Sequence, residues 1–122
     1  MISQPKVVLL AEDEPLIRMI AVDLLAEDGF DVIEAGHAVE ALAVLQQRAT
    51  SIHVLFTDLH MPGLMDGLAL AHHAYQHWPW IGLLMVSSRA RPHHTLMPLG
   101  GRFMDKPYGI RHMLDHVRDL AG

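Results

Sequence analysis

Five side chains that can carry out chemistry follow short apolar runs in this 122-residue sequence, namely Glu12, Asp13, Asp58, Ser87 and Lys106. Carboxylates that lie close together repel one another, so they stay jointly ionised only when a cation lies among them. Carboxylate oxygens suit Mg²⁺, which proteins hold through one or two carboxylates together with waters and phosphate oxygens. A lysine and a hydroxyl can bind phosphoryl oxygens. The set therefore predicts a Mg²⁺-dependent phosphoryl-transfer site with an aspartate nucleophile, provided that the fold brings these residues together.

Apolar runs and amphipathic helical patterns alternate along the chain. The first run is short, continuous and rich in β-branched residues, which is typical of a strand covered on both faces of a parallel sheet. The runs comprise Val7–Ala11, a short segment around Val32–Ile33, His53–Thr57, Ile81–Val86 and Arg102–Asp105. Apolar residues at helical spacing follow all but the fourth of these runs, beginning near Pro15, Ala38, Leu68 and Ile110.

This alternation predicts a doubly wound α/β fold, with a five-stranded parallel sheet in the flavodoxin-like order 2-1-3-4-5 and helices on both faces. The carboxyl ends of the strands then form one edge, where ligands bind in such folds. All five candidate side chains are expected to face one crevice there. The segment between Ser87 and Gly101 contains Pro92 and Pro98, so we expect a shortened or irregular fourth helix.

Four motifs at the predicted strand ends resemble the receiver domain of two-component response regulators. They are Leu9–Pro15, Thr57–Gly63 with Met65–Gly67, Val86–Ser88 and Asp105–Tyr108. Each motif alone is weak, but the four occur in the right order and at the right strand ends. The resemblance covers essentially the whole sequence, so residues 1–122 are expected to form one receiver domain, either a stand-alone regulator or part of a longer protein.

The resemblance implies a phosphoacceptor and a metal site. Asp58 would accept a phosphoryl group from the phosphohistidine of a sensor histidine kinase or a histidine phosphotransfer protein. Asp13, Asp58 and the backbone carbonyl of His60 would bind Mg²⁺, the expected cofactor, and Glu12 would reach the ion through water. The protein would catalyse its own phosphorylation and dephosphorylation only, and so would not be an enzyme in the usual sense.

The resemblance also implies a switch. Ser87 would hydrogen-bond the phosphoryl group, and Lys106 would pair with it. The Lys106–Pro107 peptide bond would be cis, as in the family. Phe103 would rotate inward when Ser87 moves, which would alter a surface that an unknown output partner recognises.

Three features depart from the family pattern. The loop Pro62–Gly67 is one residue longer than the commonest form, and Ser87 replaces the more frequent threonine. Ser88 offers a second hydroxyl beside it, although the family register favours Ser87. The proline-interrupted segment before Lys106 alters the usual fourth helix and any dimer face built on that helix. The sequence therefore leaves the oligomeric state open, with a homodimer as one of the alternatives.

Composition argues against other classes of protein. The formal net charge is −5 at pH 7, and the seven Arg and two Lys form no basic run, so direct nucleic-acid binding is not expected. There are no cysteines, which excludes disulfides and thiol catalysis. No apolar run is long enough to cross a bilayer, and the N-terminus lacks the apolar stretch of a signal peptide. We therefore expect a cytoplasmic protein without a membrane segment.

Two other functions would use the same residues. A phosphohydrolase of the aspartyl-phosphate type would share the nucleophile, the metal and the lysine. Such an enzyme normally needs a second acid two residues after the nucleophile, and His60 occupies that position here. A pseudo-receiver that is never phosphorylated would act only as a docking module, which the presence of Asp13, Asp58 and Lys106 disfavours.

Overall fold

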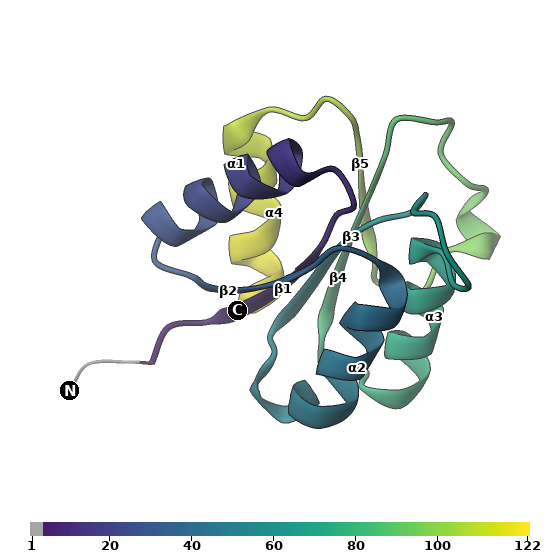
Figure 1. Ribbon diagram of the computed structural model, residues 1–122, viewed down its shortest axis with the longest axis horizontal. Coiled ribbons are helices and arrows are strands. Elements are labelled where there is room, and N and C mark those ends of the chain that lie inside the picture. The colour runs from purple at the N-terminus through teal and green to yellow at the C-terminus, as the bar shows by residue number, and fades with distance from the viewer. Residues whose placement is uncertain (1–3) are drawn as a thin grey trace.

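The computed structural model describes residues 4–122 and contains a parallel β-sheet flanked by helices (Figure 1). The strands are β1 (Val7–Ala11), β2 (Asp31–Ala35), β3 (Val54–Asp58), β4 (Gly82–Ser87) and β5 (Arg102–Asp105). The helices are α1 (Pro15–Glu27), α2 (Ala38–Arg48), α3 (Gly67–His77) and α4 (Ile110–Ala121), with the short 3-10 helices η1 (Ala49–Ser51) and η2 (His94–Leu96). Within the described residues, no helix has both the length and the apolar character needed to cross a membrane.

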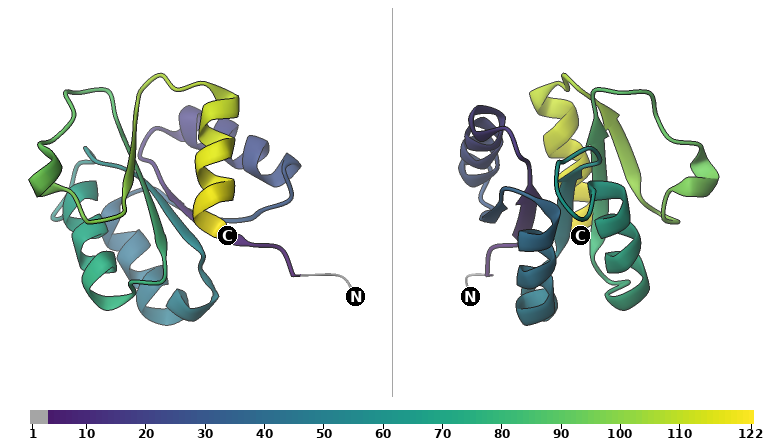
Figure 2. Two further views of the ribbon diagram at one scale, coloured as in Figure 1. Left: turned by 180° about the vertical axis from the view of Figure 1, so that it is seen from behind. Right: turned by 45° about the vertical axis from the view of Figure 1, so that its right-hand side comes forward.

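The strands lie in the order β2-β1-β3-β4-β5, and each neighbouring pair is parallel. The predicted doubly wound α/β fold is therefore confirmed. Helices α1 and α4 pack on one face of the sheet, and α2 and α3 pack on the other (Figure 2). The central neighbours β1 and β3 are separated in sequence by β2, so the chain changes direction across the sheet at this point. In such folds ligands bind beside the carboxyl ends of these two strands.

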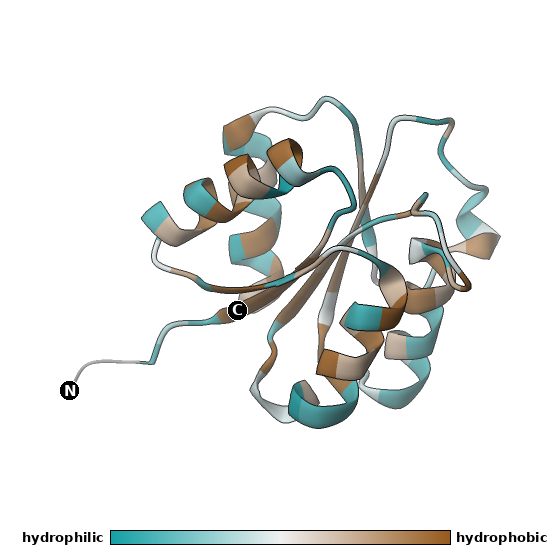
Figure 3. Cartoon of the chain, in the orientation of Figure 1, coloured by the Kyte–Doolittle hydropathy of each residue, from teal (hydrophilic) through white to brown (hydrophobic). Residues whose placement is uncertain are grey.

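Side chains that alternate along the central strands form two apolar layers. Leu9 and Leu55 belong to the layer against α2 and α3, whereas Val8 and Phe56 belong to the layer against α1 and α4. All residues of β3 are buried, including the final Asp58. Because helices cover both faces, the strands are largely apolar along their length (Figure 3). Charged residues directly follow two of them, Glu12 after β1 and Lys106 after β5.

The connection between β4 and β5 contains no α-helix. Residues 88–101 hold only η2, which confirms the expected irregular fourth helix. Figure 2 shows this segment looping out beside α3, where the His72 imidazole hydrogen-bonds the Leu96 carbonyl oxygen. Pro92 and Pro98 cannot donate backbone hydrogen bonds, so a regular helix across the segment would lose part of its hydrogen-bond ladder.

Candidate functional site

The strand register brings the acidic residues together. Ala11 pairs with Thr57, so Glu12 and Asp58 occupy neighbouring positions at the carboxyl edge of the sheet. The carboxylate oxygens of Glu12, Asp13 and Asp58 can be chosen so that all lie within 4.8 Å of one another. Glu12 and Asp58 are buried, and Asp13 is partly exposed. The structure thus brings Asp58 of β3 together with Glu12 and Asp13, the two residues that follow β1.

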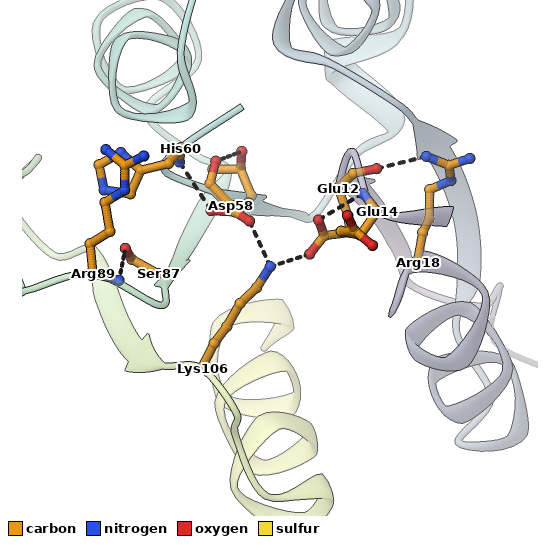
Figure 4. Close-up of polar contacts among 9 residues, drawn as sticks. Glu12, Glu14, Arg18, Asp58, His60, Ser87, Arg89 and Lys106 are labelled. Carbon is orange, nitrogen blue, oxygen red and sulfur yellow. Dashed lines mark hydrogen bonds and ion pairs between the residues drawn. The ribbon is translucent and has the colours of Figure 1, made fainter. Parts of the chain in front are cut away.

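Lys106 lies between two of these carboxylates. Its Nζ is 2.5 Å from Glu12 Oε1 and 2.6 Å from Asp58 Oδ2 (Figure 4). Burial acts to lower the pKa of Lys106, but its hydrogen bonds to Asp58 and Glu12 outweigh burial and raise that pKa above its ordinary value. The lysine is therefore charged and neutralises part of the acidic cluster.

Hydrogen bonds hold both the carboxylate and the backbone carbonyl of Glu12. Its Oε2 accepts a hydrogen bond from the Glu14 N–H at 3.1 Å, and its backbone carbonyl accepts one from Arg18 Nη1 at 2.7 Å. Burial raises the pKa of Glu12 above its ordinary value of 4.5, and the hydrogen bonds from Lys106 and Glu14 oppose this rise without cancelling it. Glu12 is therefore an acidic group kept in an environment that disfavours its charge.

The loop after β3 approaches the Asp58 carboxylate from its other side. The His60 N–H donates to Asp58 Oδ1 at 3.0 Å, whereas the His60 side chain is exposed. The backbone of His60 thus lies beside Asp58, and metal binding by its carbonyl remains a prediction. The loop ends at Asp66, which caps α3 by accepting a hydrogen bond from the Ala69 N–H.

The two candidate hydroxyls differ in their surroundings. Ser87 is the last residue of β4 and is fully buried, and its Oγ accepts a hydrogen bond from the Arg89 N–H at 2.9 Å. Ser88 is exposed and lines the same hollow as Asp58 and Lys106. The Ser87 hydroxyl is thus engaged with the backbone that follows it, and its role toward a phosphoryl group stays a prediction.

Two further expectations concern β5 and the residues after it. The Lys106–Pro107 peptide bond has the cis isomer that the resemblance implied. Phe103 lies in β5 beneath the β4–β5 segment, where it packs with Leu59 and Met85. The Arg91 guanidinium covers the Phe103 ring, with 4.7 Å between its central carbon and the ring centroid. The switching role of Phe103 stays a prediction.

A hollow of about 580 Å³ opens beside the acidic cluster. Asp58 and Lys106 lie at its polar end. Its wall is largely apolar and includes Ile17 and Ile20 of α1 and Ile110 of α4, which are exposed. Exposed apolar side chains gathered in one place are typical of an interaction surface.

Sequence patterns did not identify two arginines that contact these groups. Arg18 binds the main chain of Glu12, and Arg91 stacks on Phe103. Arg18 is the fourth residue of α1, close enough in sequence for its side chain to reach back to the end of β1, and this proximity is the one local signal. Arg91 lies in an irregular segment, so no periodic pattern points to it.

The fold and the site define a class of protein. Residues 8–118 match the family of response regulator receiver domains, so the protein belongs to that family and is a receiver domain of a two-component system. Receiver domains are in general signalling domains rather than enzymes, they usually bind Mg²⁺, and they interact with histidine kinases or histidine phosphotransfer proteins.

Individual relatives agree with this assignment. Sensor kinase CckA of Brucella abortus (strain 2308) is 30% identical over 122 residues, which are 98% of this chain and 13% of that protein. Response regulator receiver protein CpdR of the same organism is 28% identical over 119 residues, which are 94% of this chain and 96% of CpdR. The chain spans about half the length of two matched transcriptional regulators, 48% of AruR from Pseudomonas aeruginosa and 50% of TcrX from Mycobacterium tuberculosis.

Solved structures show the same fold. The crystal structure of the receiver domain from hybrid histidine kinase CckA has a TM-score of 0.82 and 28% identity, and the match covers 95% of this chain and 99% of that one. A response regulator receiver protein from Sinorhizobium medicae WSM419 has a TM-score of 0.90 at 22% identity, with 97% and 95% covered. The protein is therefore homologous to the receivers of CckA and CpdR.

Proposed function

We propose that the protein is a phosphoacceptor of a two-component phosphorelay and that residues 1–122 form its receiver domain, with Asp58 taking the phosphoryl group. The observation that carries this proposal is the sharing of the Lys106 ammonium by Asp58 and Glu12 within a cluster of three carboxylates. An oxygen of Asp58 forms the new bond to phosphorus, and the bond from phosphorus to the donor's histidine nitrogen breaks. Lys106, already at the site, pairs with the phosphoryl oxygens as their charge reaches Asp58.

The donor atoms around Asp58 fit Mg²⁺. All three clustered side chains offer oxygen, and Mg²⁺ binds oxygen at about 2.1 Å, so two of its ligands lie at most about 4.2 Å apart. The oxygens of the cluster lie within 4.8 Å of one another, which is close to such spacing. Asp13, Asp58 and the His60 carbonyl would hold the ion directly, with Glu12 through water. When bound, Mg²⁺ supplies positive charge that favours the transfer of a phosphoryl group.

The switch is part of the same proposal. Ser87 turns from the Arg89 N–H toward the phosphoryl group, and Phe103 moves inward beside it, which changes the surface formed by the β4–β5 segment. An output partner, so far unidentified, recognises the altered surface. In this proposal the protein acts in the cytoplasm, where it meets a histidine kinase or a histidine phosphotransfer protein.

The phosphodonor is expected to dock over the apolar wall of the hollow. Ile17, Ile20 and Ile110 lie next to Asp58, so a partner that covers them brings its histidine close to the acceptor. Contact there also shields the reacting groups from water, which strengthens their electrostatic interactions.

The test is to incubate the protein with Mg²⁺ and a small acyl phosphate and to measure intact mass. Wild type is expected to gain one phosphoryl group that hydroxylamine removes. D31N is expected to gain the same group, because Asp31 lies at the amino end of β2 whereas Asp58 lies at the carboxyl end of β3. D58N is expected to gain none. An adduct on D58N, or no adduct on wild type, would contradict the proposal.

Parallel incubations with an organophosphate and with beryllofluoride separate the rival functions. Continuous hydrolysis of the organophosphate, without a stable adduct on the protein, would favour a phosphohydrolase. Failure to bind beryllofluoride with Mg²⁺, together with no adduct, would favour a docking module. We expect a single phosphoryl group and no sustained turnover, because the residue two positions after Asp58 is His60 and not an acid.

A further inference from the structure

Arg18 joins three segments beside the acidic cluster. From α1, its Nη1 donates to the backbone carbonyl of Glu12 at 2.7 Å (Figure 4). Its Nε lies 3.3 Å from Glu34 Oε1 of β2. Gly36 packs against it so closely that a Cβ there would lie 3.3 Å from Nη1. The Arg18 side chain is 23% exposed. The guanidinium is thus enclosed between α1, the end of β1 and the end of β2.

The carbonyl that Arg18 binds belongs to the peptide unit between Glu12 and Asp13. Because a peptide unit is planar, holding its oxygen sets the direction of the backbone that carries both side chains. The Glu12 N–H donates to the Ala35 carbonyl at 3.0 Å, and the Glu12 carboxylate accepts from the Glu14 N–H. Of these three hydrogen bonds, the one from Arg18 is the one that holds an atom of the peptide unit between Glu12 and Asp13.

We propose that Arg18 is a positioning residue for Mg²⁺ binding, which holds the Glu12–Asp13 peptide unit so that both carboxylates converge with Asp58. This inference rests on the function proposed above. Within the acidic cluster, Arg18 contacts the main chain of Glu12 and not the carboxylates of Glu12, Asp13 or Asp58. Groups that orient metal ligands in this indirect way typically change metal affinity by about 10–100-fold when they are removed.

The charge of Arg18 acts in the opposite direction to its hydrogen bond. A guanidinium near a cation site repels the cation, so removal of the charge alone would tighten Mg²⁺ binding. Loss of the hydrogen bond to Glu12 would loosen the ligands and weaken binding. The sign of the change in affinity therefore distinguishes a positioning role from a purely electrostatic one.

The experiment measures Mg²⁺ affinity by titration calorimetry on the full chain, with thermal unfolding in EDTA recorded in parallel. R18M keeps the apolar stem and loses both the charge and the donors. R18K keeps the charge and an ammonium donor but loses the planar guanidinium. E34Q removes the charge of the outer partner and leaves residue 18 as arginine. We expect R18M to weaken Mg²⁺ binding by about tenfold or more, and R18K by less. E34Q should stay within about twofold of wild type, because the Glu34 side chain is about half exposed and its ion pair with Arg18 contributes little.

The outcomes separate this inference from the proposed function. If wild type binds Mg²⁺ and folded R18M binds it equally or more tightly, the inference is overturned and the proposed function stands. If wild type binds no Mg²⁺, both are overturned. If R18M fails to fold in EDTA, the comparison of R18K with E34Q decides, since weaker binding by R18K alone supports the inference and equal binding overturns it.

Discussion

Gly67 lies directly against the backbone of Asp58. A Cβ atom added at Gly67 would stand 1.7 Å from the Asp58 carbonyl oxygen and 2.7 Å from its carbonyl carbon. The Gly67 N–H also donates to the Leu59 carbonyl at 3.0 Å. Helix α3 therefore begins in contact with the end of β3, and this is feasible only because residue 67 has no side chain.

G67A is expected to destabilise the protein by more than about 3 kcal/mol, because backbone atoms on both sides must move to admit the methyl group. The control is G109A, since Gly109 precedes α4 and a Cβ there would meet nothing within 4 Å. G109A should lower the free energy of unfolding by less than about 1 kcal/mol. Urea unfolding measures both. Equal stability of the two variants would contradict the close approach of α3 to Asp58.

Glu12 makes the stability of the protein depend on pH. Burial raises the pKa of Glu12 above its ordinary value of 4.5, so the folded state binds a proton here more readily than the unfolded state does. Ionised Glu12 therefore costs stability at neutral pH, and the cost disappears as pH falls through the raised pKa and below 4.5.

E12Q, which removes the charge and keeps the shape, is expected to unfold at a higher temperature than wild type at pH 7 without Mg²⁺. The difference should vanish below the ordinary pKa of the carboxyl group, where Glu12 is protonated in both states. D23N, at an exposed aspartate in the middle of α1, provides the control. Thermal unfolding across a pH series measures the effect. An E12Q variant less stable than wild type at pH 7 would show that ionised Glu12 does not destabilise the folded state.

The exposed isoleucine at position 20 offers a test of phosphodonor docking. Ile20 is 51% exposed and lines the hollow next to Asp58. I20E should slow phosphotransfer from a phosphorylated histidine phosphotransfer domain by about tenfold, equivalent to 1.4 kcal/mol of lost contact. Phosphorylation by a small acyl phosphate should be unchanged, because such a donor needs no protein surface.

L99E is the matched control, since Leu99 is 81% exposed in the β4–β5 segment, away from the hollow. Its phosphotransfer rate should equal that of wild type. The rate at which radiolabelled phosphate passes to the protein is measured with the phosphotransfer domain and with the acyl phosphate as donors. If I20E and L99E slow transfer equally, the donor does not dock over α1.

Arg91 is expected to stabilise the β4–β5 segment through Phe103. R91A should lower the free energy of unfolding by about 0.5–1 kcal/mol, the usual contribution of a cation over an aromatic ring at an exposed site. R111A, at an exposed arginine of α4, serves as the control and should have a smaller effect. Urea unfolding followed by circular dichroism measures the difference, and equal effects of the two variants would rule out a specific contribution from the stacking on Phe103.

The sequence alone predicted the fold and the meeting of Glu12, Asp58 and Lys106 at one end of the sheet. Short apolar runs alternate with helical patterns, and this periodicity allows few arrangements other than a doubly wound sheet. Because parallel strands end at one edge, residues that follow strands in the sequence meet in space, as Glu12, Asp58 and Lys106 do. The prolines after β4 likewise indicated that the fourth helix would be irregular. Each of these inferences rests on local patterns or on rules of chain connection.

The tertiary structure decided which groups each side chain touches. The contact of Arg18 with the Glu12 carbonyl and the stacking of Arg91 on Phe103 join different secondary-structure elements, and no spacing in the sequence encodes them. The direction of the Ser87 hydroxyl likewise depends on the backbone that follows β4. Such contacts are set by side-chain rotamers and by packing between distant segments, so the same local pattern is compatible with several of them until the whole chain is folded.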